Sequence, residues 1–449
     1  MFSLSDSIGF LFILGLLGWV GFYKTQKTPE FLVANRSVGL FALVATLVMT
    51  EFNTSTLLAF SAAGYVSGPM AIGLPFVFLV GLSWYTVTVS RPWKRYNGLS
   101  VAGFFTQKYG PTLGKTASIL LMLAMTGFSA TYVKSMTLIF MPWFGMWGAW
   151  ILSAVLCILV LFMTLTGGLL SIIRTDVFSF IITVILFPLL CILGWSHQGG
   201  IQALKQIYAE NQLHPSLPFW FITTLIILTM FTYICSPWYG QKIFSAKNEK
   251  TAFWAVGISS CLVFLLYGTA VLAAAFYRLK SPQMPDPQMV IPSMIQAWLP
   301  VFFRGVAYAV LFAAAMTTLG GVWNTMVAMI VSDFNLQKLS VHTQRIFTFC
   351  LAIISWLGAN LLVDNILNRL ILANIPIAAL SFSLLAGFHW AKVSRTGAWF
   401  SVIVGCTWGV GCFVIFGDAG GYTWYWSIYG IPLIFMSGIL GSYLFPDQK

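Results

Sequence analysis

The sequence predicts an all-α, polytopic membrane protein with about thirteen transmembrane helices. Hydrophobic residues make up 59% of the 449 residues and charged residues only 8%, whereas soluble domains carry roughly a quarter charged residues. The mean hydropathy is +0.88. The apolar residues form runs of about twenty, the length that one helical crossing of a bilayer needs. This composition excludes a water-soluble enzyme, and the 39 Phe and 18 Trp exclude a disordered chain.

The predicted helices are apolar runs that end at charged residues, Gly or Pro. The first run contains Asp6 and shows neither a basic leading segment nor a small-residue cleavage site, so we expect it to stay as a helix. The gaps between runs are too short for a soluble domain, so residues 1–449 are expected to form a single membrane domain. In chain order the runs are 5–22, 40–65, 69–90, 115–142, 147–166, 170–195, 218–240, 252–277, 298–331, 346–363, 366–390, 396–417 and 423–445.

The basic residues predict how these helices are oriented. With the N-terminus outside, 17 of the 23 Lys and Arg residues fall in inward-facing gaps, five lie in outward gaps or at outer helix ends, and Lys134 lies inside a helix. Basic residues concentrate on the cytoplasmic side of membrane proteins. We therefore expect an outer N-terminus and a cytoplasmic C-terminus, in the plasma (inner) membrane.

Several other function classes are not supported by the sequence. The net charge of +12 is spread over short gaps and forms no basic cluster of the kind that binds nucleic acid. The seven Cys lie in apolar runs without a CxxC pair, which argues against a redox or metal role. The four His have no catalytic arrangement of carboxylates or Cys around them, so we expect no enzyme activity.

The second predicted helix carries a polar run, TEFNTSTLLAFSAAGY, at residues 50–65. At the standard helical rise, Glu51 lies roughly 16 Å into the bilayer, close to the midplane. A seam of small residues that pack against another helix accounts for the hydroxyls. It does not account for Glu51, because a carboxylate inside the membrane by default indicates a functional site.

Three further positions have both a functional and a structural interpretation. Thr317 and Thr318 precede two glycines that weaken the ninth helix, so they either bind an ion or bond to the preceding turn. Lys134 either extends to the outer interface or pairs with Glu51 or a substrate carboxylate. Arg174 and Asp176 mark the inner entrance of the sixth helix, where they form either a structural pair or part of an ion path.

Five segments together resemble the sodium:solute symporter family. They are the loop EFLVANRSVGL at 30–40, the polar run from residue 50, GGLLSIIRTDV at 167–177, YGQKIFSAKN at 239–248 and AAAMTTLGGVWN at 313–324. Their order and spacing match the family over most of the chain. Arg174 stands where the family usually has Trp, and Lys242 replaces an Arg.

The resemblance implies a LeuT-type fold with a five-plus-five inverted repeat. The repeats would be residues 40–195 and 218–390, with one extra N-terminal helix and two extra C-terminal helices. Each repeat would begin with a broken helix, which puts the substrate near the midplane between them. The second and seventh predicted helices fit these places, and Pro237 interrupts the seventh.

The resemblance also implies the positions of the binding sites. A sodium ion would be held by the carbonyls of Met49, Phe52 and Ala314 and by the hydroxyls of Thr317 and Thr318. Gly320 and Gly321 replace the small hydroxylated residues that the family often has after the ion site, which leaves the number of sodium ions open. Seven residues are candidates for substrate binding: Glu51, Thr54, Thr56, Lys134, Thr229, Thr232 and Tyr233. Asp176 is a candidate for gating or for the ion path.

The predicted function is sodium-coupled symport of a small polar organic solute, such as an amino acid or a carboxylate, by alternating access. The expected partners are this solute, the sodium ion and the lipid bilayer, with neither nucleic acid nor an obligate protein partner. Two alternatives remain at this level. A proton could replace sodium, since Glu51 is an intramembrane acid, or the chain could be a solute sensor that acts through a separate partner.

Overall fold

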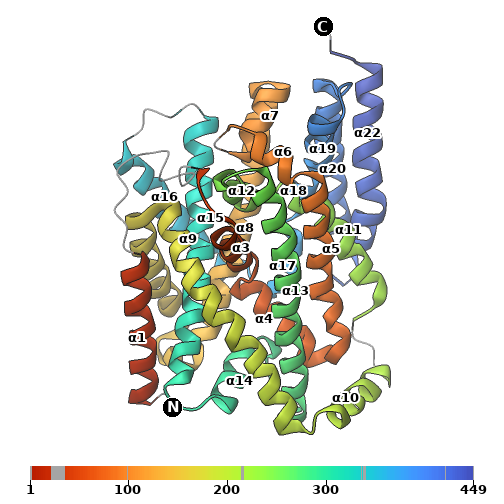
Figure 1. Ribbon diagram of the computed structural model, residues 1–449. Coiled ribbons are helices and arrows are strands. Elements are labelled where there is room, and N and C mark those ends of the chain that lie inside the picture. The colour runs from red at the N-terminus through yellow and green to blue at the C-terminus, as the bar shows by residue number, and fades with distance from the viewer. Residues whose placement is uncertain are drawn as a thin grey trace.

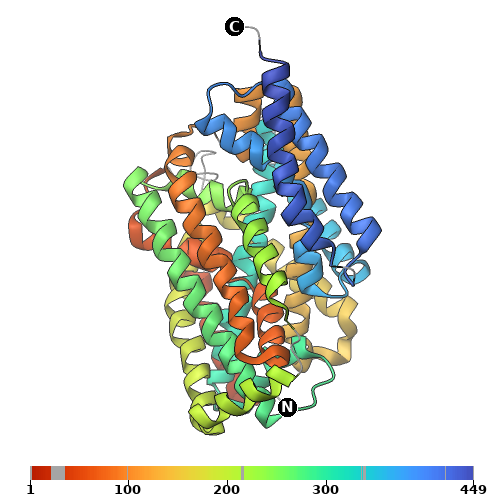
Figure 2. The same cartoon turned by 90° about the vertical axis from the view of Figure 1, so that its right-hand side faces the viewer.

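The computed structural model describes residues 3–21, 36–98, 100–213, 217–334, 336, 340–419 and 421–447. Over these ranges the regular structure is helical, with one isolated bridge between Val38 and Ala246. Figure 1 shows most helices running along one common direction, with the N-terminus at the lower end and the C-terminus at the upper end. Figure 2, a quarter turn away, shows the two termini at the same opposite ends. The all-α prediction is confirmed.

The first half of the chain forms long helices joined by short turns. In order they are α1 (Leu4–Gly21), α3 (Leu40–Glu51), α4 (Thr54–Ser67), the 3-10 helix η2 (Gly68–Ile72), α5 (Gly73–Thr88), α6 (Ser90–Arg95), α7 (Val101–Tyr109), α8 (Pro111–Phe144), the 3-10 helix η3 (Gly145–Trp147), α9 (Gly148–Gln198) and α10 (Ile201–Leu213). The 51 residues of α9 correspond to about 77 Å of helical rise, more than twice the hydrocarbon thickness, so α9 contains two predicted spans.

The second half continues in the same way. Its elements are α11 (Phe219–Tyr233), α12 (Pro237–Ser245), α13 (Glu249–Lys280), the 3-10 helix η4 (Pro287–Met289), α14 (Val290–Trp298), α15 (Phe303–Asp333), α16 (Val341–Leu361), α17 (Ile366–Leu372), α18 (Ile375–Ala379), α19 (Ser381–His389), α20 (Arg395–Phe416), α21 (Tyr422–Trp424), the π-helix η5 (Tyr425–Gly430) and α22 (Ile431–Leu444). Several starts are fixed by side-chain caps that accept from a backbone N–H three residues on, for example Ser100, Asn248, Ser340 and Ser394.

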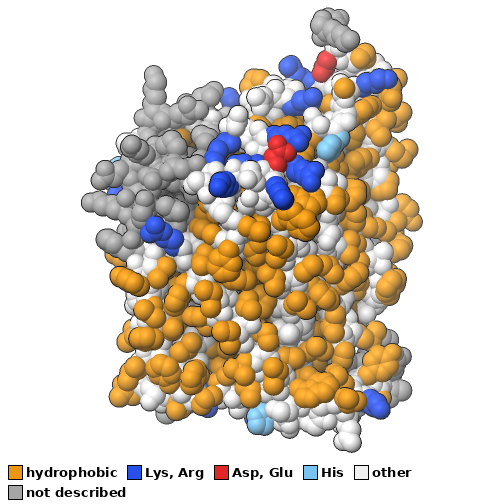
Figure 3. All heavy atoms as spheres, in the orientation of Figure 1, with side chains coloured by type: hydrophobic (Ala, Val, Ile, Leu, Met, Phe, Trp, Pro, Cys, Tyr) orange, Lys and Arg blue, Asp and Glu red, His pale blue; other side chains and the backbone are white. Residues whose placement is uncertain are grey.

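The outer surface suits a lipid bilayer. In Figure 3, hydrophobic side chains cover the middle and lower parts of the visible face, and Lys and Arg gather toward its upper end. Large apolar side chains such as Phe12, Trp19, Phe162 and Val414 are exposed on α1, α9 and α20. An exposed apolar surface of this extent is stable only in contact with lipid tails. The protein is therefore an integral membrane protein, as predicted.

The number of membrane crossings stays a prediction. In the described part of the chain, nine helical stretches are long and apolar enough to cross a membrane. The number rises to as many as eleven if each of two bent helix pairs also counts as one crossing. Two of these stretches, Thr54–Thr88 and Pro111–Leu165, each overlap two predicted helices. The predicted total of thirteen is thus neither matched nor contradicted by this count.

Two interruptions place irregular backbone inside the bundle. Helices α3 and α4 are separated at residues 52–53, within the second predicted helix. Helices α11 and α12 meet at a bend of 51° around residues 234–236. Pro237 begins α12, where its missing N–H costs nothing. Unpaired backbone groups are tolerated in a membrane only inside protein or beside water, so both breaks are expected to face the protein interior or a water-filled cavity.

The extra N-terminal helix is fixed to α15 by close contact. The buried Asp6 accepts a hydrogen bond from the backbone N–H of Phe302, with 3.1 Å between Phe302 N and Asp6 Oδ1. At Gly305, a Cβ atom would lie 1.8 Å from the Asp6 carbonyl oxygen, so only glycine allows this approach. The first predicted helix is therefore part of the packed bundle.

Candidate functional site

Hydrogen bonds from polar side chains stabilise the break between α3 and α4. The Asn53 side chain accepts a hydrogen bond from Thr56 N at 2.9 Å, which caps α4. Its amide nitrogen donates to the Glu51 carbonyl at 3.0 Å, and the Tyr267 hydroxyl on α13 donates to the same carbonyl. These bonds satisfy backbone groups that the missing helical turn leaves unpaired. Specific hydrogen bonds thus stabilise the interruption of the helix.

Glu51 ends α3 and projects into the interior with only half of its carboxylate paired. The residue is 1% exposed. Its Oε2 accepts a hydrogen bond from the Tyr233 hydroxyl on α11 at 2.6 Å. Its Oε1 is buried and accepts no hydrogen bond from the described residues.

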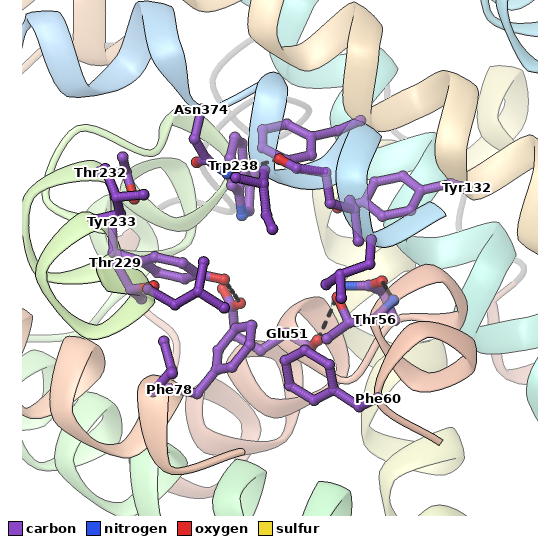
Figure 4. A pocket seen from close by; sticks show the side chains of 18 residues that line it. Glu51, Thr56, Phe60, Phe78, Tyr132, Thr229, Thr232, Tyr233, Trp238 and Asn374 are labelled. Atoms are coloured by element: carbon purple, nitrogen blue, oxygen red, sulfur yellow. Dashed lines mark hydrogen bonds between the residues drawn. The ribbon is translucent and has the colours of Figure 1, made fainter. Parts of the chain in front are cut away.

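A cavity opens beside Glu51, between the two broken helices and α5, α8 and α17 (Figure 4). Its volume is about 90 Å³, enough for several waters or a small solute. Apolar and aromatic side chains dominate the lining, and a few polar groups face in. The lining residues are Glu51, Asn53, Thr56, Phe60, Val77, Phe78, Phe128, Tyr132, Leu225, Leu228, Thr229, Thr232, Tyr233, Trp238, Leu367, Leu370, Ile371 and Asn374.

The structure brings five of the seven predicted substrate residues to this cavity: Glu51, Thr56, Thr229, Thr232 and Tyr233. The other two lie elsewhere. The Thr54 hydroxyl lies 2.8 Å from the Ser135 hydroxyl and joins α4 to α8. Lys134 is half-buried on α8, outside the lining, and forms none of the ion pairs found in the described ranges.

Sequence reasoning missed most of the aromatic wall of the cavity. Phe60, Phe78, Tyr132, Trp238 and Asn374 come from five different elements or their ends. Aromatic residues in apolar helices are common in ordinary cores, so the sequence offers no signal that separates wall from core. The one available signal was Trp238, which lies next to the predicted break at Pro237.

Two of the five predicted ion ligands meet between α3 and α15. The Thr318 hydroxyl donates to the Met49 carbonyl at 3.3 Å and so bridges the two helices. The Thr317 hydroxyl lies 3.4 Å from the Ala314 carbonyl on its own helix. Phe52, the fifth predicted ligand, is buried directly after α3. A hard cation takes oxygen donors, and this neutral oxygen set from two helices fits sodium.

Asp176 is part of a buried ion pair that the sequence did not reveal. Its Oδ2 accepts from Lys242 Nζ on α12 at 2.9 Å and from the Thr46 hydroxyl on α3 at 2.5 Å. Lys242 also donates to the Thr46 carbonyl at 3.0 Å and to the Thr50 hydroxyl. The predicted gating residue therefore joins α9, α12 and the first half of the broken helix.

A cavity between broken helices, in a bundle with an apolar outer surface, is typical of a membrane transporter and not of an enzyme. Residues 31–405 match the model of the Sodium:solute symporter family. The chain belongs to this family, as its motifs implied, and its function class is sodium-coupled symport of small solutes. The proton-coupled alternative is not favoured.

Relatives and solved structures agree with this assignment. Sodium/proline symporter 2 of Staphylococcus saprophyticus is 24% identical over 436 residues, covering 88% of this chain and 82% of the relative. The sodium/pantothenate symporter of Haemophilus influenzae is 24% identical over 438 residues, covering 88% and 86%.

A Na⁺-coupled sialic acid symporter in its substrate-bound outward-open state has a TM-score of 0.82 at 17% identity over the whole of both chains. Mhp1 in its inward-facing conformation has a TM-score of 0.60 at 14% identity, covering 94% of this chain and 96% of that chain. The predicted LeuT-type fold is confirmed.

Proposed function

We propose that the chain moves a small polar organic solute inward together with sodium by alternating access. The ion ligands are the carbonyls of Met49, Phe52 and Ala314 and the hydroxyls of Thr317 and Thr318. The solute occupies the cavity beside Glu51. We assign residues 40–195 and 218–390 as the two repeats, because each begins with a broken helix, α3/α4 and α11/α12.

The observation that carries this proposal is the position of both sites on one half-helix. Met49 and Glu51 are two residues apart at the end of α3, and the first contacts Thr318 while the second lines the cavity. An ion that holds α3 against α15 therefore also fixes one wall of the solute cavity. By linkage, the two ligands then strengthen each other's binding by the same factor. One sodium entering down a potential of 100 mV supplies about 2.3 kcal/mol for this work.

The solute class follows from the cavity and from the relatives. The relatives are named for proline and pantothenate, which are small, polar and organic. The cavity has a comparable scale, with one carboxylate and several hydroxyls among apolar walls. These features support an amino acid or a related polar solute.

We place the N-terminus outside and the C-terminus in the cytoplasm of the plasma membrane. The two termini lie at opposite ends of the bundle, and the basic side chains of the visible face gather at the end that carries the C-terminus (Figures 1 and 3). The positive-inside rule makes that end cytoplasmic.

The experiment measures thermal unfolding of the detergent-purified protein in sodium chloride and in potassium chloride at equal ionic strength. Sodium at 100 times its dissociation constant should stabilise the folded state by about 2.7 kcal/mol. Thr318→Ala should lose this sodium-specific shift. Thr407→Ala should keep it, because the exposed Thr407 hydroxyl bonds only to carbonyls of its own helix, α20. Equal melting temperatures in the two salts, or an undiminished sodium-specific shift in Thr318→Ala, would contradict the assigned ion site.

A further inference from the structure

We propose that the transported solute is an organic amine and that Glu51 is the counter-ion of its ammonium group. This inference rests on the proposed transport function and adds the chemical class of the solute. It follows from three features of the cavity: the unpaired carboxylate oxygen, the charges around it and the aromatic wall.

The first feature is the unpaired oxygen of Glu51. Tyr233 fills one hydrogen-bonding position at Oε2, while Oε1 is buried without a partner among the described residues. An unpaired oxygen of a buried carboxylate destabilises the folded state unless something donates to it. Figure 4 shows Glu51 at the rim of the open space, bonded to Tyr233. A ligand in the cavity can therefore complete the carboxylate, and an ammonium group offers up to three N–H donors and a matching charge.

The second feature is the charge distribution. The residues that line the cavity include one acid, and none of them is Lys, Arg or His. Lys242, on the same broken helix as Tyr233 and Trp238, is bound to Asp176, Thr46 and Thr50. A solute whose single charge is a carboxylate would find no cation in the wall to pair with, and an unpaired charge is costly in a low-dielectric interior. The cavity thus selects against such anions.

The third feature is the aromatic wall. Phe60 and Phe78 lie beside Glu51, and Tyr132 and Trp238 lie across the open space from them (Figure 4). Aromatic faces attract cations, and desolvated examples contribute on the order of 2 kcal/mol. The same rings cover an apolar solute body. A carboxylate surrounded by rings therefore matches an amine with a hydrocarbon part.

A polyhydroxylated solute fits this cavity less well. It would need many hydrogen-bond partners, yet the amide nitrogens of Asn53 and Asn374 already donate to backbone carbonyls at 3.0 and 2.8 Å. The remaining polar groups are a few hydroxyls in a mainly apolar lining. The cavity therefore suits a solute that makes one strong ionic contact and is otherwise covered by apolar side chains. It suits a solute that needs a network of hydrogen bonds less well.

The test is a comparison of matched probes on the detergent-purified protein in sodium chloride. The probes are n-butylamine, n-butanol, butyrate and tetramethylammonium, and the readout is the probe concentration that gives half of the maximal rise in melting temperature. Butylamine should act at a concentration at least tenfold below the other three, which corresponds to about 1.4 kcal/mol. Butyrate or butanol acting as well as butylamine would overturn the inference. Equal action by tetramethylammonium, which has no N–H, would overturn the bond to Oε1.

Two variants test whether Glu51 causes the preference for butylamine. Glu51→Gln should lose the preference for butylamine over butanol. Glu249→Gln, which removes an acid exposed on the surface and paired with Arg95, should keep it. A butylamine preference that persists in a folded Glu51→Gln protein would overturn the role of Glu51. The probe ranking in the unmodified protein stands as a test even if Glu51→Gln does not fold.

The sodium measurement separates this inference from the proposed function. A sodium-specific shift without any butylamine preference overturns the amine assignment and leaves the symport proposal in place. A butylamine preference without a sodium-specific shift overturns the symport proposal and leaves only the amine preference of the cavity, with Glu51 as its counter-ion.

Discussion

Removal of the charge of Asp176 should destabilise the folded protein strongly, because it leaves the Lys242 ammonium buried without a counter-ion. The two side chains are only 1% and 6% exposed, and Nζ and Oδ2 lie 2.9 Å apart. Breaking a buried pair of this kind typically costs about 3–5 kcal/mol. With an unfolding entropy near 2.1 cal/mol/K for each residue, that loss lowers the melting temperature of 449 residues by about 3–5 °C.

The assay is thermal unfolding of four proteins in the same detergent: the unmodified chain, Asp176→Asn, Lys242→Met and the double variant. Because the double variant leaves no buried charge unpaired, it should recover most of the loss seen in either single variant. Asp364→Asn is the matched control. Its pair with Arg369 has the same 2.9 Å separation, but the two side chains are 72% and 29% exposed. A change of less than about 1 kcal/mol is expected there. Additive losses in the double variant would refute the reasoning.

Two further predictions concern the broken helix and its packing. Asn53→Ala removes the cap of α4 and should lower the free energy of unfolding by about 1 kcal/mol. Asn248→Ala removes the corresponding cap of α13 and should have a similar cost. Only Asn53→Ala should also weaken the sodium-specific shift in melting temperature. Equal sodium responses in the two variants would show that the cap does not support the ion site. Gly64→Ala should lower the free energy of unfolding by about 1–3 kcal/mol, because the new Cβ would lie 2.6 Å from the Val271 carbonyl oxygen. Gly268→Ala should be neutral or stabilising, because no atom lies within 4 Å of its new Cβ. Similar melting temperatures for both glycine variants would show that α4 and α13 can separate at little cost.

The sequence predicted features whose causes are local. Glu51 stood out because a carboxylate is costly in an apolar run, and Pro237 indicated a break because proline cannot continue a helix. The adjacent hydroxyls of Thr317 and Thr318 were recognised through the family resemblance, and the structure places Thr318 against Met49. Each of these signals is contained in a few neighbouring residues.

Features that depend on the packing of distant helices were not predictable from the sequence. Thr54 and Lys134 belong to helices that line the cavity but are not among its lining residues, since a shift of one or two residues along a helix changes the face on which a side chain lies. The pair of Asp176 with Lys242 joins residues 66 positions apart, and nothing in either segment identifies the other as its partner. The sequence therefore located the helices that build the site better than the faces they present.

The division of the site between helices has a consequence for how this transporter can change. The predicted ion ligands belong to α3, α15 and the residue after α3, whereas most of the cavity wall comes from α5, α8, α11 and α17. Substitutions at Phe78, Tyr132 or Thr229 can therefore reshape the solute space without touching an ion ligand. Evolution or design could exchange one cargo for another while the energy source is kept. Only α3 has no such freedom, because its last six residues serve three tasks at once: Met49 for the ion, Glu51 for the solute, and Thr46 and Thr50 for the attachment to Lys242 of α12.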